Sequence, residues 1–302
     1  MKHSVLFCHL VAFVIVAIWG STFIFTKLLL LNGLSPAQIF TLRFMIAYVL
    51  LLLFEQLFRR SRRRWLADSW RDELLMLALG VTGGSLYFLT ENEALNYTTT
   101  TNVSLIVCSC PLVAALLIGL FYRSERMQPL QVAGTLLAVC GVAAVVLNGH
   151  FVLHLSPVGD LLALAANLCW ALYSLFMVRA NSHYGAVFIT RKVFFYGLLT
   201  MIPYYMLVPE WPSVEVLLRP QVAAHLLFLG VVASMLCFLV WTWVMDKLGA
   251  VVATNYVYVN PVSTIICARL VLHEQITVFF LLGTALILLG LFLADTKKRP
   301  RT

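Results

Sequence analysis

The chain alternates between long apolar runs and short polar segments. Each run has roughly 20 residues, the length that an α-helix needs to cross the hydrocarbon core of a bilayer. Because a backbone exposed to lipid must satisfy its own hydrogen bonds, these runs are expected to be helical. The pattern predicts an all-α integral membrane protein with ten transmembrane helices, near residues 8–30, 36–58, 73–95, 99–121, 128–148, 157–180, 185–208, 221–245, 250–272 and 276–294.

The first run follows Lys2 and has the general form of a secretory signal peptide. It continues to Leu31, however, without a small-residue cleavage site. We therefore expect it to remain as the first transmembrane helix. The segments between runs carry turn residues such as Asn32-Gly33, and none is long enough for a separate soluble domain.

Basic residues gather in the segments that would face one side of the membrane. With a cytoplasmic N-terminus, the inside segments hold most Lys and Arg residues, including RRSRRR at 59–64, whereas Arg219 alone lies outside. The positive-inside rule predicts cytoplasmic N- and C-termini in a multi-pass protein of the plasma (inner) membrane. The formal net charge of +8 then reflects topology and contact with anionic headgroups, and we predict no nucleic-acid partner.

Composition supports the same class. Of 302 residues, 62% are hydrophobic and 11% charged, against roughly 45–50% and 25% in a soluble domain. These values exclude a disordered chain and disfavour a soluble enzyme. The seven cysteines lie in apolar runs without CxxC or metal-ligand spacing. We interpret them as small buried side chains and predict no metal and no cofactor.

The two halves of the sequence match each other at an offset of about 150 residues. Each half holds five predicted spans, an odd number, so the second half enters the bilayer from the opposite side. The sequence therefore predicts two inverted five-helix repeats, residues 1–149 and 150–302, an arrangement suited to alternating access. The matches that carry the comparison are Trp19 with Trp170, Gly80 with Gly230, Pro111 with Pro261, Glu125 with Glu274, Gly134 with Gly283 and Gly141 with Gly290.

The doubled motifs also resemble a known family. The first copy contains Trp19-Gly20-Ser21, Lys27, Ser35-Pro36, Arg43, Pro111, Glu125, Gly134 and Gly141, and the second contains Pro261, Glu274, Gly283 and Gly290. In their order these residues resemble the EamA family of the drug/metabolite transporter superfamily. The resemblance implies a ten-helix fold around a central cavity and, commonly, export of amino acids or other small metabolites. Trp170 is followed by Ala171-Leu172 rather than Gly-Ser, one of several departures that leave the substrate open.

Aromatic, hydroxyl and amide side chains on shared helix faces are the candidate cavity lining. Such walls suit amphipathic ligands through stacking, cation–π contacts and selective hydrogen bonds. The alternative is that these side chains face lipid or pack between helices. The predicted substrate-binding residues are Trp19, Thr22, Tyr87, Glu91, Asn102, Asn167, Trp170, Tyr173, Trp241, Asn255 and Tyr258.

Charged residues within the spans are candidates for gating or coupling. Tyr87 and Glu91 share one helix face because they are four residues apart, and Glu91 lies roughly 6 Å below the outer end of its span. A carboxylate at this depth can bind a substrate ammonium or carry a proton, and it can also pair with a basic neighbour. Arg43 and Lys192 are gate or anion-binding candidates, with snorkelling as the alternative. The gating and coupling set is Lys27, Arg43, Glu91 and Lys192, and Lys27, Arg43, Glu91 and Glu93 could latch the outer side closed.

Glycines seven residues apart mark one face of the fifth and tenth spans. Gly134 with Gly141, and Gly283 with Gly290, are two helical turns apart. Small residues allow helices to approach closely. We therefore expect these two spans to form either an internal scaffold or a homodimer surface.

The sequence contains no Walker loop, GxSxG elbow or HExxH motif. We predict a protein that is not an enzyme: a secondary active transporter, in the export direction, of small organic metabolites such as amino acids or amphipathic compounds. Proton coupling through Glu91 is a further hypothesis. The alternatives are a lipid-linked substrate flippase, a membrane-embedded enzyme, or a structural subunit with a sealed interior.

Overall fold

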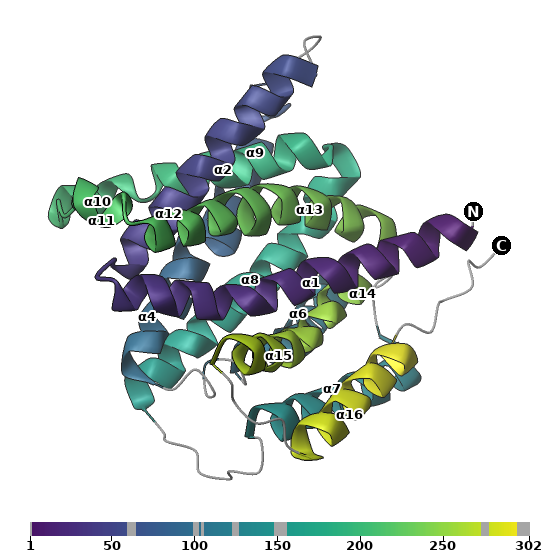
Figure 1. The fold of residues 1–302 in the computed structure, drawn as a ribbon. Coiled ribbons are helices and arrows are strands. Elements are labelled where there is room, and N and C mark those ends of the chain that lie inside the picture. The colour runs from purple at the N-terminus through teal and green to yellow at the C-terminus, as the bar shows by residue number, and fades with distance from the viewer. Residues whose placement is uncertain are drawn as a thin grey trace.

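A computed structural model describes residues 2–58, 65–98, 103, 106–122, 127–147, 156–272 and 278–294, which form helices and no β-strand (Figure 1). The all-α prediction is confirmed for these residues. The elements are α1 (Lys2–Leu31), α2 (Pro36–Phe58), α3 (Trp70–Gly80), η1 (Val81–Ser85), α4 (Leu86–Tyr97), α6 (Cys110–Phe121), α7 (Pro129–Leu147), α8 (Pro157–His183), α9 (Ala186–Leu199), α10 (Ile202–Leu207), α11 (Val214–Leu217), α12 (Pro220–Leu227), η3 (Phe228–Leu236), α13 (Cys237–Leu248), α14 (Ala250–Asn255), η4 (Tyr256–Val259), α15 (Asn260–Leu272) and α16 (Val278–Ala294).

Six continuous helical stretches are long and apolar enough to cross a membrane. Three shorter apolar helices, Ile106–Phe121, Pro129–Ala144 and Leu281–Ala294, lie among the described residues as well. The chain is therefore built for a lipid environment. The six long stretches are Val5–Leu31, Pro36–Leu57, Trp70–Tyr97, Pro157–His183, Ala186–Leu207 and Pro220–Leu248.

Local sequence fixes where several helices begin and end. At the start of α2 the Ser35 N–H donates to Gln38 Oε1 at 3.0 Å, and the Gln38 N–H donates to Ser35 Oγ at 3.2 Å. This reciprocal pair is a capping box. At the end of α1, Gly33 has φ +89°, a conformation that glycine adopts without steric cost. The turn between α1 and α2 follows from these residues.

Two membrane-length helices contain π-helical segments. The segment η1 joins α3 to α4, and η3 joins α12 to α13. Each follows or includes a glycine in close contact with another helix: a Cβ at Gly80 would lie 2.5 Å from Tyr196 Cβ, and one at Gly230 would lie 2.7 Å from Ile46 Cβ. A π-helical turn shifts the residues after it around the helix axis, and such turns are frequent at functional sites.

Helices α7 and α16 lie side by side and antiparallel (Figure 1). A Cβ at Gly134 would lie 2.6 Å from the Gly290 carbonyl oxygen, and one at Gly141 would lie 2.7 Å from the Gly283 carbonyl oxygen. The four predicted glycines therefore face each other within one chain. This contact is the one that the internal-scaffold alternative predicts.

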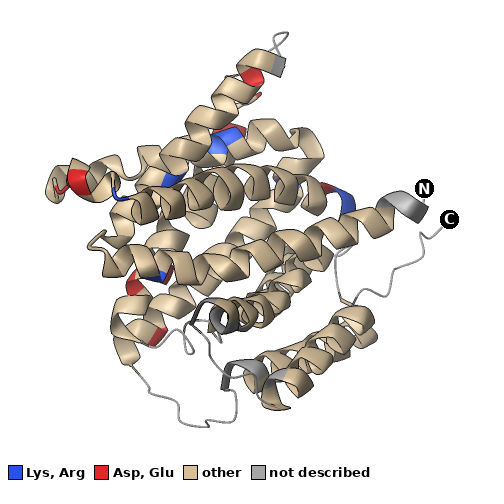
Figure 2. Cartoon of the chain, in the orientation of Figure 1, with Lys and Arg blue, Asp and Glu red and all other residues tan. Residues whose placement is uncertain are grey.

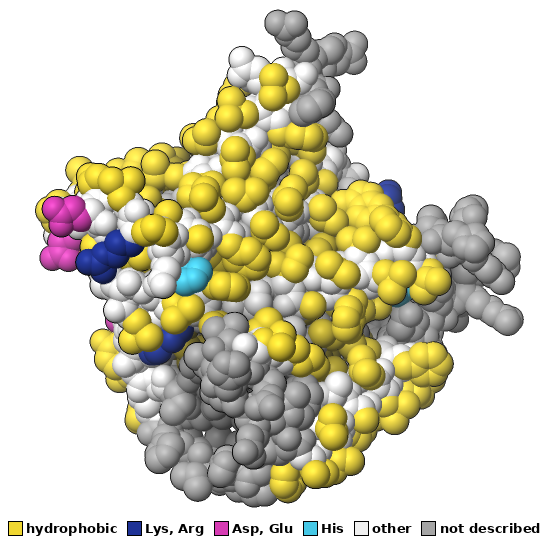
Figure 3. All heavy atoms as spheres, in the orientation of Figure 1, with side chains coloured by type: hydrophobic (Ala, Val, Ile, Leu, Met, Phe, Trp, Pro, Cys, Tyr) yellow, Lys and Arg dark blue, Asp and Glu magenta, His cyan; other side chains and the backbone are white. Residues whose placement is uncertain are grey.

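Hydrophobic side chains are spread widely over the described helices on the face in Figure 3. Exposed side chains include many leucines, for example Leu10, Leu120 and Leu288. Charged residues are sparse on the described helices, and blue and red segments lie close together where α9 crosses α2 (Figure 2), where Arg191 pairs with Glu55. This distribution is expected of a surface in contact with lipid tails.

Candidate functional site

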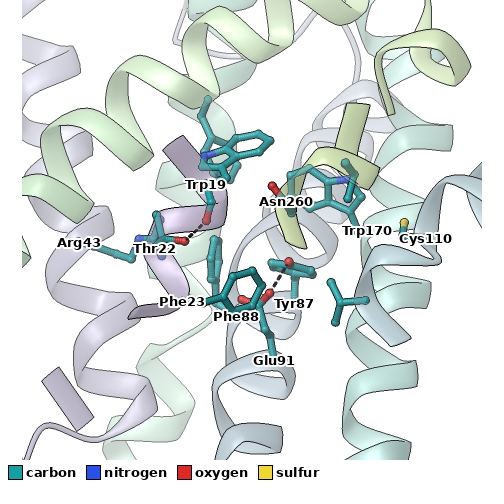
Figure 4. A pocket seen from close by; sticks show the side chains of 13 residues that line it. Trp19, Thr22, Phe23, Arg43, Tyr87, Phe88, Glu91, Cys110, Trp170 and Asn260 are labelled. Carbon is teal, nitrogen blue, oxygen red and sulfur yellow. Dashed lines mark hydrogen bonds between the residues drawn. The ribbon is translucent and has the colours of Figure 1, made fainter. Parts of the chain in front are cut away.

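The candidate site is an internal cavity of about 40 Å³. Its walls come from α1, α2, α4, α6, α8, α13 and the η4–α15 junction, so elements from both halves of the chain enclose it (Figure 4). One water needs roughly 10–15 Å³ of such space, so the cavity holds about three or four waters. Its lining residues are Trp19, Thr22, Phe23, Arg43, Tyr87, Phe88, Glu91, Val107, Cys110, Trp170, Phe238, Val257 and Asn260.

Aromatic rings form much of the wall. The ring of Trp19 lies 5.5 Å from that of Trp170 and 5.6 Å from that of Phe238, both in edge-on geometry. Trp19 Nε1 donates to the Ala233 carbonyl at 2.9 Å, in η3. The π-helical segment therefore helps to orient this indole. Edge-on aromatic contacts and a satisfied indole N–H together make a rigid wall.

A buried carboxylate lies at one side of the cavity. The Tyr87 hydroxyl donates to Glu91 Oε1 at 2.6 Å, one helical turn along α4 (Figure 4). Glu91 is 7% exposed. This hydrogen bond occupies one of the two carboxylate oxygens, which leaves acceptor capacity for a ligand.

A buried guanidinium lies on another side. Arg43 is 2% exposed, its Nε donates to Ser234 Oγ at 2.8 Å, and its Cζ lies 4.4 Å from the centre of the Phe88 ring. Within the described structure Arg43 and Glu91 form no ion pair or hydrogen bond with each other, and each has a different partner.

Two further polar atoms at the cavity have no hydrogen-bond partner among the described residues. They are the indole Nε1 of Trp170 and the amide Oδ1 of Asn260. Both side chains line the cavity and are more than nine-tenths buried. Buried polar groups normally have a partner, so one free donor and one free acceptor are available to a solute or to water.

The remaining predicted binding residues lie around the cavity or away from it. Tyr173 and Trp241 are fully buried behind the lining, with ring centres 5.1 Å from Trp170 and 5.1 Å from Trp19 respectively. Asn255 is buried in α14, with its Oδ1 unpartnered among the described residues. Tyr258 packs in a separate cluster that includes residues of α7 and α16. Asn102 lies outside the described residues.

Asn167 bridges two helices. Its Nδ2 donates to the Ile106 carbonyl at 2.6 Å and to Ser109 Oγ at 2.8 Å. These bonds connect α8 to the segment before α6. A mid-span amide can line a pathway or bond across helices, and Asn167 makes the cross-helix bonds.

The charged residues of the predicted outer latch do not come together in one cluster. Lys27 is exposed, and Glu93 accepts a 3.3 Å hydrogen bond from Asn96. In the part of the chain that the structure describes, neither forms an ion pair with Arg43 or Glu91. The outer latch is therefore unformed in this conformation.

Two other ion pairs join α9 to its neighbours. Arg191 Nη1 donates to both Glu55 oxygens, at 2.9 and 2.7 Å, and both side chains are buried. Lys192 pairs with Glu73, which also accepts from the Tyr196 hydroxyl. Lys192 therefore ties α9 to α3 rather than facing the cavity that Arg43 lines.

Several lining residues were missed by the sequence analysis, chiefly Phe23, Phe88, Phe238 and Asn260. Phe88 and Phe238 match at the 150-residue offset between the halves, but a phenylalanine inside an apolar run looks the same toward lipid and toward a cavity. Asn260 carried a usable signal, since an amide directly before Pro261 in mid-run is costly to bury without a purpose. For metals, the described residues contain no cluster of three or more His, Cys, Asp or Glu side chains.

Comparison with known proteins gives consistent matches over the whole chain. The profile of the EamA-like transporter family matches residues 6–147 and residues 157–294. An "Uncharacterized transporter" of Archaeoglobus fulgidus is 27% identical over 292 residues, 96% of this chain and 98% of the relative. A "Probable amino-acid metabolite efflux pump" of Escherichia coli is 25% identical over 291 residues, covering 93% and 92%. A solved crystal structure aligns with a TM-score of 0.74 at 18% identity, over 97% of this chain and 96% of that one, a likeness of fold.

Proposed function

The chain belongs to the EamA-like transporter family, and on that premise we propose that it is a secondary active exporter of small organic metabolites that works by alternating access. Membership makes it a multi-pass membrane transporter rather than an enzyme. The observation that carries the proposal is the cavity between the two halves of the chain, with aromatic walls and a buried charge of each sign. The name of the Escherichia coli relative supports export of amino-acid metabolites.

Two halves of opposite orientation suit alternating access, and we propose ten spans in two inverted repeats, residues 1–149 and 150–302. Pairwise contacts support this proposal. Gly134 meets Gly290 and Gly141 meets Gly283, so exchanging each glycine for its counterpart in the other half reproduces the same two contacts. The π-helical segments, η1 in the first half and η3 in the second, also lie about 150 residues apart. An inverted repeat gives inward-open and outward-open states of similar energy.

The proposed orientation has both termini in the cytoplasm and the chain in the plasma (inner) membrane. The distribution of Lys and Arg residues supports it. In this orientation the Glu55–Arg191 and Glu73–Lys192 pairs lie toward the cytoplasmic side, and Arg43 and Glu91 lie toward the outer side.

The cavity is too small for an organic solute as it stands. With room for about three or four waters, it must widen before a metabolite can enter. We therefore assign this conformation to a closed state of the transport cycle. The substrate would enter when the helices of the two halves separate on one side.

We expect the purified protein in proteoliposomes to export members of a metabolite panel, and export to depend on a pH gradient through Glu91. Glu91→Gln should abolish the gradient dependence while downhill exchange continues, because the amide cannot bind and release a proton. Glu215→Gln, at an exposed position on α11, is the matched control. Unchanged gradient dependence in Glu91→Gln would exclude this route of coupling, and absence of any transported compound would exclude the transporter function.

Cys110 offers a direct test of the cavity as the substrate site, since its side chain lines it. In a variant that keeps Cys110 alone, a small methanethiosulfonate reagent should modify it during turnover. A transported compound at ten times its Kd should slow modification roughly tenfold, because only the empty site reacts. A Glu215→Cys variant on the same background should react at a rate that the compound does not change. Equal rates at Cys110 with and without the compound would place the substrate elsewhere.

A further inference from the structure

Resting on the proposed alternating access, we propose that Trp19 and Trp170 are matched gating residues that exchange hydrogen-bonding roles during the transport cycle. In the conformation described here, Trp19 Nε1 donates to the Ala233 carbonyl in η3. In the inward-open state, Trp170 Nε1 would donate to the Gly83 carbonyl in η1, and Trp19 would release η3. Each state then has one anchored indole.

The first argument is the equivalence of the two acceptors. The identities that flank the two π-helical regions match at an offset of 150 residues, for example Gly80 with Gly230. Gly83 in η1 is therefore the counterpart of Ala233 in η3. Because the two indoles also match between the halves, donor and acceptor are both present a second time in the chain.

The second argument is that the two indoles differ in their bonding. Trp19 Nε1 has its acceptor at 2.9 Å, whereas Trp170 Nε1 has no partner among the described residues. Trp170 is 6% exposed, so its side chain is also largely withdrawn from bulk water. An unpartnered buried donor is unfavourable. A conformation that supplies an acceptor relieves this cost.

The third argument is the position of Trp170 beside the proposed acceptor segment. Its ring centre is 5.1 Å from that of Tyr87, which follows Gly83 by one helical turn. Directly after Gly83 the backbone departs from helical geometry, since Gly84 has φ −126° and ψ −108°. A side-chain donor can insert where the regular hydrogen bonding of a helix is interrupted. The proposed acceptor therefore lies on the helical stretch that Trp170 already contacts.

The fourth argument is the side chain that now packs on Gly83. A Cβ at Gly83 would lie 2.3 Å from Cδ2 of Tyr173, which is on the same helix as Trp170. Tyr173 is 1% exposed, whereas its counterpart Thr22 is partly exposed and lines the cavity. In the proposed orientation Tyr173 lies on the cytoplasmic side of Trp170, so its packing on Gly83 closes the inner half. Moving this ring away would open the inner side and make room for the indole.

Two substitutions test the exchange because their effects must have opposite signs. Trp19→Phe removes a bond of the present state and should favour the inward-open state. Trp170→Phe removes a bond of the inward-open state and should favour the present one.

Cysteine reporters at equivalent buried positions measure the shift. Thr26→Cys lies on the outer side of Trp19, and Met177→Cys lies on the inner side of Trp170. Each is introduced as the single cysteine of the full chain and treated in detergent with a small methanethiosulfonate reagent. The modification rate follows the population in which that position is open.

We expect Trp19→Phe to raise the ratio of the Met177→Cys rate to the Thr26→Cys rate about fivefold, the effect of one hydrogen bond on a two-state population. Trp170→Phe should lower this ratio by about the same factor. Trp70→Phe, at an exposed tryptophan, is the control and should leave the ratio unchanged. Shifts of the same sign in the first two variants, or no shift in either, would overturn the exchange.

Gly83→Ala is an independent test that keeps both indoles. Its methyl group would collide with the Tyr173 ring in the present state. Ala233 shows that alanine fits a π-helical segment whose carbonyl accepts from an indole. Gly83→Ala should therefore raise the ratio, and adding Trp170→Phe should lower it again about fivefold. A wild-type ratio in a Gly83→Ala protein that elutes as a single species would overturn the role of η1.

The outcome separates this inference from the proposed function. A protein that transports compounds while both tryptophan variants shift the ratio in one direction is a transporter gated by other contacts. Opposite shifts in a protein that moves no compound in proteoliposomes would support the exchange and exclude the transport function.

Discussion

Arg191→Met is expected to lower the free energy of unfolding by about 3–5 kcal/mol. Arg191 donates two hydrogen bonds to Glu55, at 2.9 and 2.7 Å, and the two side chains are 3% and 8% exposed. Removing the guanidinium leaves the Glu55 carboxylate buried without this compensating charge. The change should appear as a lower melting temperature in detergent and as unfolding at a lower SDS fraction in mixed micelles.

The double variant Glu55→Leu with Arg191→Met should recover most of the lost stability. Replacing both charges by apolar side chains removes the desolvation cost along with the attraction. Arg179→Met is the control, because its 3.5 Å pair with Asp72 has an arginine side chain that is 56% exposed, and exposed pairs contribute about 1 kcal/mol or less. If Arg191→Met has the same melting temperature as the wild type, the pair does not stabilise the contact between α2 and α9.

Sequence patterns predicted the parts of the candidate site that depend on the position of residues along one helix. Tyr87 and Glu91 are four residues apart on α4, and the sequence predicted that they share a helix face. In the structure they are joined by a 2.6 Å hydrogen bond. The match of Trp19 with Trp170 across the halves singled out two residues that both line the cavity. Helical spacing is a local pattern, and an internal repeat is found by comparing the sequence with itself. Both can therefore be detected in a single sequence.

These patterns could not predict contacts between helices that are far apart in the sequence. Arg43 was predicted to have a gate or anion-binding role, but its partner Ser234 was not predicted. Ser234 belongs to a π-helical segment, where an extra residue changes which side chains face inward. The Glu55–Arg191 pair depends on how α2 crosses α9, which hydropathy does not encode. For Lys192 the sequence suggested a gate or anion-binding role like that of Arg43, whereas packing against α3 gives it Glu73 as a partner.

Helix α7 against α16 shows where sequence and packing meet. The two pairs of glycines, seven residues apart, predicted a close helix approach, and the structure places them within one chain. Lipid tails are as apolar as leucine side chains, so hydrophobic burial does not drive this contact. Close van der Waals packing, which the small residues allow, stabilises it instead.

Gly290→Val is therefore expected to cost about 3 kcal/mol of stability and to separate α16 from α7. A Cβ at this position would lie 2.5 Å from the Gly134 carbonyl oxygen and 2.6 Å from the Ala138 backbone nitrogen. Both neighbours are backbone atoms of a helix, so neither can turn aside as a side chain would. Melting in detergent and the monodisperse fraction in size-exclusion chromatography should both fall.

The reciprocal variant Gly141→Val should be about equally damaging, since its Cβ would lie 2.7 Å from the Gly283 carbonyl oxygen and 2.7 Å from the Ile287 backbone nitrogen. Leu289→Val, at an exposed position beside Gly290, should leave melting nearly unchanged. A tolerated valine at either glycine would show that the two helices can move apart without loss. A severe effect at one glycine and none at the other would contradict the two-fold relation between the halves, because that relation makes the two contacts equivalent.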